Sequence, residues 1–555
     1  MPDQDSAARQ PPLRIGVLVD EQTLPRFEEE ILRRIQASQF ANIEVVIRAP
    51  KLTQSAPTAT HPSAVFHRYE RRDLRRRNDP ANDPLAKVDC RGILVAVPSV
   101  ELASEPRREG AADASAQDAI AGELRELSLD VVIQLGSCAL PAEYMSLCRY
   151  GVWSILLGDP NSDTSGPPYF WETYRNDAVS TAAVLVHDAQ RQLVVEIGHF
   201  ATRPTSLAWN RRQPCWTAVA LLLQRLEVLA HRGWDAASCN AVAYAPRMRR
   251  FISPSNSQML RWLARDSWQK LAKRIQGRTV KHWRIATRVG GQIRPADGRA
   301  DLGGFRFHES PQGHFYADPM LWNRDGRNWL FFEDYHYATH LGTISCAEVL
   351  PDGALGPTMD VLSRPYHLSF PFLLEDGGEL YMIPESGDNG AIELFRCVEF
   401  PDRWEYDCAL LDFAAVDTTI TWIGDRYWLF TSVPEPRANA MQLQLYSSPS
   451  LRGEWAPHPC NPISNDIRCN RGGGAMFIDG ERVIRVSQDG SRIYGHSFSF
   501  HEIVDLTPET YRERLMLNVD PSWSQGLIGT HTYARCGDVE AVDGVMRRRR
   551  KGTAV

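Results

Sequence analysis

The sequence lacks the features that mark membrane-spanning, secreted and zinc-binding proteins. It has no uninterrupted run of about 18 apolar residues, so we expect no membrane-spanning helix. Its first twelve residues, MPDQDSAARQPP, contain neither the basic nor the apolar segment of a secretory signal, and we expect residues 1–12 to be disordered. The eleven cysteines form no CxxC pair and no zinc-ligand spacing with histidine, so we predict reduced thiols, no metal site and a cytoplasmic location.

The sequence also lacks a strong charge of one sign. A formal net charge of -6 on 555 residues indicates no basic surface for nucleic acid, which we do not expect as a partner. A chain of this length exceeds one ordinary core, and its content of 43% hydrophobic residues is typical of globular proteins. We therefore predict a multidomain protein.

Short apolar runs alternate with helical stretches over residues 13–205. Helices are predicted at 24–40 and near 114–127, and the charged run 68–84 is interpreted as a solvated loop. The candidate strands are RIGVLVD (14–20), NIEVVIRA (42–49), RGILVAVPSV (91–100) and DVVIQLGS (130–137). This alternation indicates an α/β domain with a parallel, doubly wound sheet.

Residues 206–300 have helical periodicity and form a predicted helical connector. Within it, SQMLRWLARDSWQKLAKRIQGR (257–278) carries six cations and one acid, Asp266. An amphipathic helix of this charge can lie on an anionic membrane surface, which would make the protein peripheral to a membrane. The interpretation that we favour is a connector packed between two domains. Residues 546–555 form a basic tail.

The C-terminal part contains an internal repeat of an apolar strand, a polar turn with glycine and a second, mostly aromatic-rich strand. The copies are DPMLWNRDGRNWLFFED (318–334), FPFLLEDGGELYMIPES (370–386), DTTITWIGDRYWLFTSV (417–433) and, with a gap, GGAMFIDGERVIRVSQD (473–489). The first three starts are 52 and 47 residues apart, a period typical of β-propeller blades. A weaker fifth unit, LIGTHTYARCGDVEAVDG (527–544), completes a predicted five-bladed, all-β propeller over residues 301–545.

Propeller geometry predicts which polar residues meet at one mouth of the central channel. The innermost strand of each blade starts there and the second strand returns there, so the two ends converge. The predicted site residues are Asp318, Asp417, Arg468, Arg471 and His531 at strand starts, Glu333, Asp334, Glu385 and Asp489 at strand ends, and His367 and Arg492 in adjoining loops.

Paired carboxyl groups in a cleft suit glycosidic chemistry, in which one group acts as an ionised base or nucleophile and another as a protonated acid. The alternative for each acid is a turn cap that accepts backbone hydrogen bonds. Arginines beside the acids suit an anionic ligand such as a phosphorylated or nucleotide-linked sugar, because guanidinium pairs with phosphate through two bonds. Alternatively, they neutralise the acids in a buried ring of ion pairs.

The propeller motifs resemble those of two known groups. ADP at 317–319, followed by DGRNWLFFED, is similar to the first blade of the arabinanase, β-xylosidase and invertase class. The phrases RPYHLSFPFLLEDGGELYMIPES (364–386), VDTTITWIGDRYWLF (416–430) and QDGSRIYG (488–495) resemble the propeller region of the glucosamine inositolphosphorylceramide transferase family and its bacterial relatives. The resemblance to the hydrolases implies Asp318 as the base-like residue, Asp417 as an orienting residue and Glu385 as the proton donor.

The segment 130–174 resembles the folate-dependent formyltransferase domain, and STAAVLVHDAQRQLVVEIGHF (180–200) is similar to that family's hairpin. The resemblance implies a Rossmann-like fold for residues 13–205. The family's Asn-x-His, which holds and protonates the formyl group, falls on Ser154-Ile155-Leu156. Leucine can donate no proton, so we predict the fold without formyl transfer.

These patterns together predict a carbohydrate-active protein, a glycosyl-transferring enzyme of glycan or glycolipid biosynthesis with its site at the propeller mouth. A nucleotide sugar is the predicted donor, and no other cofactor is predicted. Three alternatives stay open: a glycoside hydrolase of the arabinanase or β-xylosidase type, a non-catalytic propeller that binds glycans or a partner, and an acyl or formyl transferase acting on an amino sugar.

Overall fold

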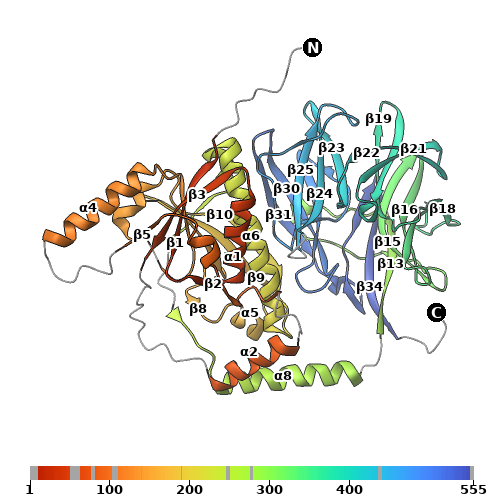
Figure 1. The fold of residues 1–555 in the computed structure, drawn as a ribbon. Coiled ribbons are helices and arrows are strands. Elements are labelled where there is room, and N and C mark those ends of the chain that lie inside the picture. Colours follow the sequence, from red (N-terminus) through yellow and green to blue (C-terminus); the bar gives the residue numbers. More distant parts are fainter. Residues whose placement is uncertain are drawn as a thin grey trace, which may run out of the picture. The chain divides into compact units, whose positions relative to one another are not determined.

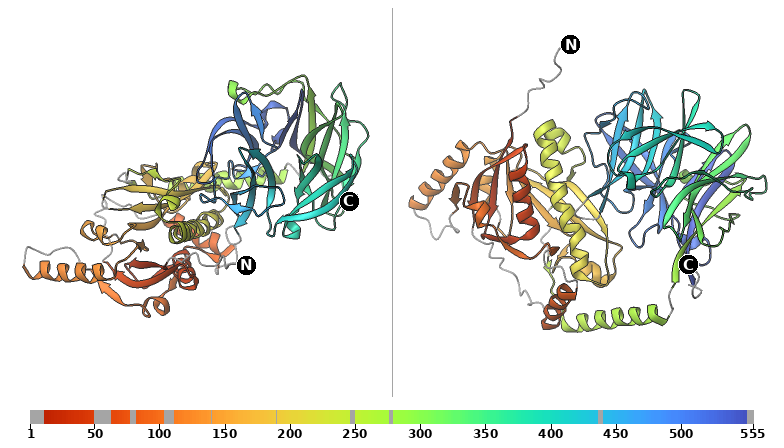
Figure 2. Two further views of the ribbon diagram at one scale, coloured as in Figure 1. Left: turned by 90° about the horizontal axis from the view of Figure 1, so that it is seen from above. Right: turned by 45° about the vertical axis from the view of Figure 1, so that its right-hand side comes forward.

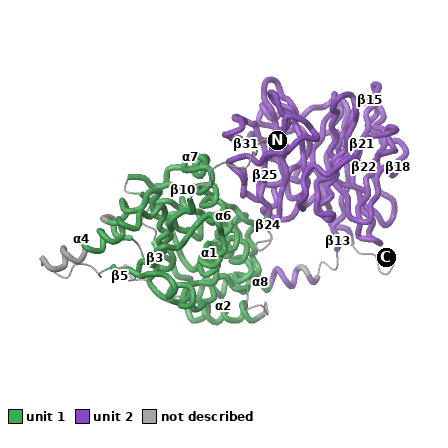
Figure 3. Tube along the Cα trace, turned by 45° about the horizontal axis from the view of Figure 1, so that its top comes forward, with its two compact units in different colours: residues 1–267, 436–440 green, residues 268–435, 441–555 purple. Residues whose placement is uncertain are grey.

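The structure, a computed structural model, describes residues 11–49, 63–76, 82–102, 111–138, 140–188, 190–245, 250–275, 279–435 and 440–549. The chain divides into two compact units, residues 1–267 with 436–440, and residues 268–435 with 441–555 (Figure 1, Figure 3). Residues 1–10 of the predicted disordered segment and residues 550–555 of the predicted basic tail lie outside the described residues.

The N-terminal unit is built around one eight-stranded sheet of order β11-β10-β9-β7-β6-β1-β3-β5. These strands are β1 (Leu13–Val19), β3 (Ala41–Arg48), β5 (Ser99–Glu101), β6 (Val131–Gln134), β7 (Val152–Leu157), β9 (Val179–His187), β10 (Gln192–Ala201) and β11 (Val242–Ala243). The strands from β5 to β7 pair in parallel, whereas β9, β10 and β11 pair antiparallel. The parallel half agrees with the alternating sequence pattern, because parallel strands need crossover connections.

Two small sheets complete the strands of this unit. One joins β2 (Thr23–Pro25) to β4 (Lys87–Asp89), and the other joins β8 (Thr164–Ser165) to β12 (Arg250–Phe251). The helices are α1 (Arg26–Ala37), α2 (Ala64–Arg76), α3 (Arg91–Leu94), α4 (Ala111–Glu126), α5 (Phe170–Arg175), α6 (Leu207–Arg232), α7 (Trp234–Ala237) and the first part of α8 (Asn256–Ile275), whose residues from Trp268 onwards belong to the C-terminal unit.

Neighbouring residues of the central strands pack on opposite faces of the large sheet. Val17 of β1 packs with Ile31 of α1 and Leu222 of α6, whereas Leu18 packs with Leu124 of α4. Figure 2 shows the sheet of this unit with its helices from two further directions. Because both faces are covered, β1 needs apolar residues at successive positions, which explains its nearly continuous apolar run.

Two segments of this unit differ from their predicted structure. The run 68–84 is predicted as a loop, but α2 occupies its first part, where the Asp73 carboxylate accepts hydrogen bonds from the Ser206 hydroxyl at 3.0 Å and the Ala208 amide at 2.9 Å. These bonds cap α6 and hold α2 against it. The predicted strand 91–100 is split between α3 and β5. Pro98 cannot donate a hydrogen bond to a neighbouring strand, and β5 begins directly after it.

The C-terminal unit is a five-bladed β-propeller, which confirms the predicted architecture. Four of its sheets follow one another along the chain. They contain β15 (His314–Arg324), β16 (Arg327–His336), β17 (Leu341–Val349) and β18 (Met359–Leu362); β19 (Ser369–Asp376), β20 (Glu379–Glu385), β21 (Ile392–Glu399) and β22 (Arg403–Leu411); β23 (Val416–Ile423), β24 (Arg426–Glu435), β25 (Ala440–Ser448) and β26 (Ala456–Pro457); and β27 (Arg471–Gly472), β28 (Phe477–Asp479), β29 (Arg482–Asp489), β30 (Ser497–Leu506) and β31 (Tyr511–Val519). The repeated sequence phrases form the inner hairpin of each blade.

The fifth sheet joins segments from the two ends of the propeller. β13 (Thr279–Val289) pairs antiparallel along its whole length with β34 (Val539–Arg549), and β14 (Arg306–Phe307), β32 (Leu527–Gly529) and β33 (Tyr533–Cys536) complete the sheet. The C-terminal strands of this blade agree with the predicted fifth unit, but the prediction of a helical connector over 206–300 is wrong for 279–289, which form β13. Pairing of the first strand with the last closes the ring and leaves no open edge between them.

The two long helices of the predicted connector have different environments. α6 packs Leu222 and Leu226 in the core of the N-terminal unit. α8 buries Met259 and Trp262 in that core, whereas Trp268 is 69% exposed. Among the described helices, none combines the length and apolar character that a membrane crossing requires.

Glu540 connects the fifth sheet to the segment after β13. Its buried carboxylate accepts hydrogen bonds from the Arg288 guanidinium, from the Ile293 amide at 2.6 Å and from the Tyr533 hydroxyl at 2.7 Å. Removal of one partner leaves the other charge buried and unpaired, so we expect Glu540→Ala to lower the free energy of unfolding of the propeller by about 3–5 kcal/mol.

Urea unfolding followed by tryptophan fluorescence measures this loss. The exposed Glu481 supplies the control variant Glu481→Ala, which we expect to change the free energy of unfolding by less than about 0.5 kcal/mol. Equal stability of the Glu540→Ala and Glu481→Ala variants would contradict the role of Glu540.

Candidate active site at the mouth of the propeller

Three inner strands carry the same backbone distortion near their first residues. Register shifts interrupt the ladders of β15, β19 and β23 at this point. One residue in each bulge has a positive φ: 52° at Asp318, 46° at Phe370 and 53° at Asp417. This conformation is strained for side chains other than glycine, and aspartate tolerates it better than most. A bulge changes the direction in which a side chain projects from its strand. The carboxyl groups of Asp318 and Asp417 at the channel are thus both carried by strained backbone.

Each of the five sheets contributes at least one predicted side chain to a common cluster. The Nε atom of Arg471 donates a hydrogen bond to Oδ2 of Asp417 at 2.5 Å, and its Nη2 lies 3.8 Å from Oε2 of Glu385. Nε2 of His531 lies 3.6 Å from Oδ1 of Asp318. The structure therefore brings together residues that are up to 213 positions apart, from Asp318 to His531, as propeller geometry predicts.

Glu385 is held in its protonated form near neutral pH. Burial and, to a smaller extent, the Asp417 carboxylate raise the pKa of its carboxyl group from 4.5 to about 8, against the opposite effect of Arg471. The Glu385 side chain keeps 18% of its surface exposed. A protonated carboxyl group with a path to solvent can act as a proton donor.

Asp318 loses its proton more readily than Glu385. Burial raises the pKa of Asp318 to about 6, while the neighbouring His531 lowers it and the Thr532 hydroxyl donates a hydrogen bond to Oδ1 at 3.0 Å. Asp318 is therefore mostly ionised at neutral pH. Burial also raises the pKa of Glu333 well above its usual value, with further contributions from Asp318 and Glu385. The mouth thus contains carboxyl groups in different protonation states.

His531 belongs to a dense network beneath the mouth. Its Nδ1 lies 2.5 Å from Oδ2 of Asp543, and Oδ1 of Asp543 accepts hydrogen bonds from the amides of His531 at 2.8 Å and Thr532 at 3.1 Å. Burial opposes the charged form, but Asp543 and then Asp318 raise the pKa of His531. Asp318, His531 and Asp543 also lie close enough to share an ion; their mutual hydrogen bonds already account for this arrangement.

Three residues of the mouth were missed by the sequence analysis: Trp283, Tyr494 and Asp543. The ring of Trp283 stacks on His531 at 4.0 Å between centroids. Tyr494 is 50% exposed, and its ring lies 5.1 Å from the Arg471 guanidinium. Tyr494 and the glycine after it belong to the phrase QDGSRIYG, whose resemblance to known propellers was the signal for it. Trp283 lies on β13, outside the predicted repeat. Asp543 lies on β34 near the end of the weak fifth unit 527–544, so the rule that second strands end at the mouth could have found it.

Several other predicted residues have different partners. Arg468 was predicted to face the carboxyl cluster, but it forms an ion pair with Asp466 at 2.5 Å instead. Asp489 accepts a hydrogen bond from the Ser491 amide at 2.8 Å, which is the alternative role of a turn cap. Arg492 is exposed. Of the three predicted arginines, Arg471 alone pairs with a residue of the cluster.

Two predicted residues of the first blade have histidine partners. Nε2 of His367 lies 3.5 Å from Oε1 of Glu333, and its Nδ1 accepts a hydrogen bond from the Gly342 amide at 2.9 Å. Asp334 lies 2.8 Å from Nδ1 of His314. Asp334 follows Glu333 directly on β16, so the two side chains project to opposite faces of the blade.

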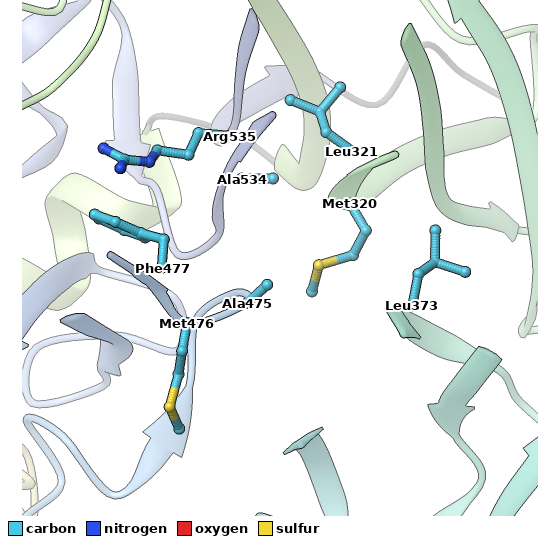
Figure 4. A pocket seen from close by; sticks show the side chains of 8 residues that line it. All are labelled: Met320, Leu321, Leu373, Ala475, Met476, Phe477, Ala534 and Arg535. Atoms are coloured by element: carbon cyan, nitrogen blue, oxygen red, sulfur yellow. The ribbon is translucent and has the colours of Figure 1, made fainter. Parts of the chain in front are cut away.

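The channel becomes apolar beyond the carboxyl cluster. A cavity of about 40 Å³ lies farther along the inner strands (Figure 4). Its lining residues are Met320, Leu321, Leu373, Ala475, Met476, Phe477, Ala534 and Arg535. Polar chemistry is thus concentrated at the end of the channel where the inner strands begin.

The N-terminal unit has a partly buried acid, Glu28, beside a small cavity. The cavity has a volume of about 40 Å³ and is lined by Glu28, Gln134, Gly136 and Ser154 among others. Burial raises the pKa of Glu28 to about 7, and the Gly136 amide donates a hydrogen bond to it at 3.0 Å. Ser154 lies on β7.

The raised pKa of Glu385 makes the free energy of unfolding depend on pH. The unfolded chain releases this proton near pH 4.5, whereas the native state keeps it until about pH 8, so native stability falls as the pH rises between these values. We expect Glu385→Gln to increase the free energy of unfolding at pH 8 by on the order of a few kcal/mol, and to change it little at pH 4.5.

Urea unfolding at a series of pH values measures this effect. Glu375→Gln is the matched control, because Glu375 is exposed on the same hairpin, and we expect no such pH trend for it. A Glu385→Gln effect that is the same at both pH values would show that the Glu385 carboxyl group is not held protonated.

Solved structures are similar to parts of this chain at low TM-scores. The family 117 glycoside hydrolase Zg3597 of Zobellia galactanivorans has a TM-score of 0.31 and 12% identity, covering 48% of this chain and 90% of its own. The Cellvibrio cellulosa α-L-arabinanase complexed with arabinohexaose has a TM-score of 0.28 and 14% identity, covering 38% and 78%. Glycinamide ribonucleotide transformylase 1 of Symbiobacterium toebii has a TM-score of 0.25 and 13% identity, covering 40% and 88%.

Sequence comparison gives a stronger match over the propeller. Residues 307–526 match the family described as "Glucosamine inositolphosphorylceramide transferase 1, N-terminal". Glucosamine inositolphosphorylceramide transferase 1 of Arabidopsis thaliana is 37% identical over 207 residues, which are 36% of this chain and 27% of that protein. The protein of the same name from Oryza sativa subsp. japonica is 32% identical over 205 residues, 36% of this chain and 28% of its own. The C-terminal unit is thus a five-bladed propeller that resembles the N-terminal region of the glucosamine inositolphosphorylceramide transferase family.

Proposed function

We propose that the propeller mouth is the active site of a glycosyl-transferring enzyme of glycan or glycolipid biosynthesis. The observation that carries the proposal is the convergence of Asp318, Glu385 and Asp417 on one cluster with Arg471 and His531. Within it the carboxyl groups have unequal pKa values, about 6 for Asp318 and about 8 for Glu385. Near neutral pH one group is then mostly ionised while the other is protonated, which is the pair that acid–base catalysis at a glycosidic bond requires. The similarity to proteins named as transferases supports transfer as the reaction.

Each residue has a distinct role in this proposal. Asp318 accepts the proton of the attacking hydroxyl group, and Glu385 donates its proton to the departing oxygen. The new bond from the acceptor oxygen to the sugar forms as the bond to the departing oxygen breaks, so charge is conserved across the step. Arg471 pairs with Asp417 and lies 3.8 Å from Glu385. Together Asp417 and Arg471 orient the carboxyl group of Glu385, and they shift its pKa in opposite directions.

The charge of the mouth favours a neutral sugar at the carboxyl groups. Arg471 and His531 are the cations of the cluster, and they are outnumbered by its carboxyl groups: Asp318, Glu333, Glu385, Asp417 and Asp543. The oxygen that departs from a nucleotide sugar belongs to a phosphate, so this phosphate would lie beside the protonated Glu385 and the Arg471 guanidinium, which are 3.8 Å apart. The exposed Arg492 is a further candidate contact for the rest of the nucleotide.

Two alternatives use the same mouth. In a glycoside hydrolase, water replaces the acceptor hydroxyl group and the carboxyl roles are unchanged. In a glycan-binding propeller, the carboxyl groups only accept hydrogen bonds from sugar hydroxyls. The half-exposed ring of Tyr494 would offer a stacking surface in all three cases.

Amide substitutions of the three acids test the proposal. We expect Asp318→Asn and Glu385→Gln each to lower turnover by at least about 100-fold, because general acid–base catalysis contributes about 10²–10⁴-fold. We expect Asp417→Asn to lower turnover as well, because Asp417 helps to keep Glu385 protonated. Turnover is measured as release of nucleotide from a panel of nucleotide sugars in the presence of short glycans and glycolipids, with hydrolysis recorded in the absence of acceptor.

The control substitution is Asp325→Asn in the turn of the first hairpin. Asp325 has a φ of 52°, equal to that of Asp318, but is exposed, so this variant imposes the same backbone demand outside the cluster. Wild-type activity in all three acid variants would refute the enzymatic proposal. Glycan binding that persists in the three variants, without turnover by the wild type, would establish the binding alternative.

We also propose that α8 contacts an anionic lipid surface. Leu260, Trp268 and Leu271 lie on one side of the helix, and each is about half exposed or more: 60%, 69% and 49%. Arg261 and Arg274 are exposed on the flanks of this apolar stripe. Apolar side chains bordered by cations suit the interface of a membrane that carries negative charge.

Co-sedimentation with vesicles tests this contact. We expect the full chain to bind phosphatidylserine vesicles more tightly than phosphatidylcholine vesicles, and the double variant Trp268→Ser with Leu271→Ser to bind at least about tenfold more weakly. Val95→Ser is the control, since Val95 is 68% exposed in the N-terminal unit. Equal binding of the double variant and the wild type would contradict the proposal.

The predicted likeness of the N-terminal unit to formyltransferases supplies no catalytic role in this proposal. Ser154, Ile155 and Leu156 lie on β7 and carry neither the amide nor the imidazole that formyl transfer uses. Glu28 is the titratable residue beside Ser154. An acyl transferase acting on an amino sugar therefore has less support than chemistry at the propeller mouth.

A further inference from the structure

The first blade carries two histidines and an aspartate on one face of its inner hairpin. His314 of β15 and His336 of β16 are directly paired in the antiparallel ladder, and Asp334 lies two residues before His336. Because side chains alternate along a strand, Asp334 and His336 project to the same face. The ladder therefore holds the three side chains together without a contribution from any loop.

The potential ligand atoms of these side chains form a compact triangle. Oδ1 of Asp334 lies 2.8 Å from Nδ1 of His314 and 3.9 Å from Nε2 of His336. All three ligand atoms lie within 4.8 Å of one another, and the two imidazole rings are 4.1 Å apart between centroids. Ligands that surround one ion at about 2.1 Å are roughly 3.0–3.4 Å apart, so small rotations of the side chains would bring these atoms to that spacing.

We propose that His314, Asp334 and His336 bind a divalent first-row transition metal ion. Two imidazoles and one carboxylate suit Zn²⁺, Co²⁺ or Fe²⁺ better than Mg²⁺ or Ca²⁺, which prefer oxygen ligands. The imidazole side chains are 27% and 29% exposed, whereas Asp334 is 8% exposed. The ion can thus enter from solvent, and its remaining coordination positions would face outwards, as in metal sites that keep an open position.

A hydrogen-bonded His–Asp pair is the alternative explanation for the contact of His314 with Asp334. It does not account for His336, whose Nε2 approaches the same carboxylate oxygen and lies 3.4 Å from the Thr343 hydroxyl. That hydroxyl also lies 3.5 Å from the carbonyl oxygen of Asp334, so Thr343 supports the cluster from β17. Such neighbouring contacts orient metal ligands in known sites.

This site is separate from the carboxyl cluster at the mouth. Asp334 and Glu333 are neighbours on β16, but they project to opposite faces of the blade. The prediction of no metal site rested on the lack of zinc-ligand spacing between cysteines and histidines, which says nothing of two histidines and an aspartate. The signal present in the sequence is the placement of ligand residues on both strands of one hairpin, with Asp334 and His336 two positions apart on the second strand and His314 on the first.

Zinc titration of the chelator-treated full chain tests the proposal. We expect calorimetry to detect one saturable Zn²⁺ site, and Co²⁺ at the same site to give visible absorption bands typical of nitrogen and oxygen ligation. His336→Gln and Asp334→Asn should each weaken Zn²⁺ binding by at least about tenfold. Zn²⁺ should raise the temperature at which the wild-type propeller unfolds, and should not do so in these variants.

His340→Asn is the matched control. His340 is exposed in the turn of the same blade, and asparagine accepts its positive φ of 58°. We expect this variant to keep the Zn²⁺ site. Loss of binding in His336→Gln and Asp334→Asn but not in His340→Asn establishes the site, whereas equal Zn²⁺ affinity in all variants and the wild type, or no saturable binding in the wild type, overturns it. Circular dichroism shows whether each variant is folded.

Discussion

The guanidinium group of Arg471 is the interaction on which the mouth of the propeller depends. It pairs with Asp417 and lies near Glu385, so one cation connects carboxyl groups from two further blades. Without it, several buried acids would share one opening with His531 as their main counter-charge. Acids in that position cannot all ionise, and the excess of carboxyl groups over cations is the reason that some stay protonated. Their unequal protonation is what makes the mouth suited to acid–base chemistry.

Backbone strain contributes to the same arrangement. Asp318 and Asp417 occupy equivalent bulges in different blades, both with positive φ. Strained conformations persist where the surrounding structure determines them, and here the hairpin ladders on both sides of the bulge supply that constraint. The equivalent bulge of the second blade holds Phe370, whose side chain is buried. The distortion is therefore a property of the repeated blade, and the residue placed in it decides whether the blade contributes an acid.

Closure of the ring and construction of the mouth are coupled in the fifth sheet. β13 supplies Trp283, which stacks on His531, and β34 supplies Asp543, which holds the imidazole through a short contact. Farther along these strands, Glu540 binds Arg288 in the interior of the sheet. The strands that join the two ends of the propeller thus also orient one side of the candidate site. A chain that lost this closure would lose His531 from the cluster as well.

Much of the site could be predicted before the structure, because it follows from the repeat. The position of each acid relative to the start or end of its hairpin places Asp318, Asp417 and Glu385 at one mouth, and the structure brings them there. The charge partners could not be predicted in the same way. Arg468 and Arg471 are three residues apart and chemically identical, but Arg468 pairs with Asp466 and Arg471 with Asp417. Their environments differ through the packing of neighbouring blades, which no local pattern describes.

Strand alternation, turn glycines and a regular period are local properties of the chain, so the sequence predicts the propeller and four acids of its mouth, Asp318, Glu333, Glu385 and Asp417. The role of residues 279–289 as the closing strand, and the position of His314 beside Asp334 and His336, follow from the tertiary structure. The protonation of each carboxyl group of the mouth also follows from the tertiary structure. All three features depend on distances between segments that are remote in sequence, because those distances set the burial of each group and its interactions with other charges.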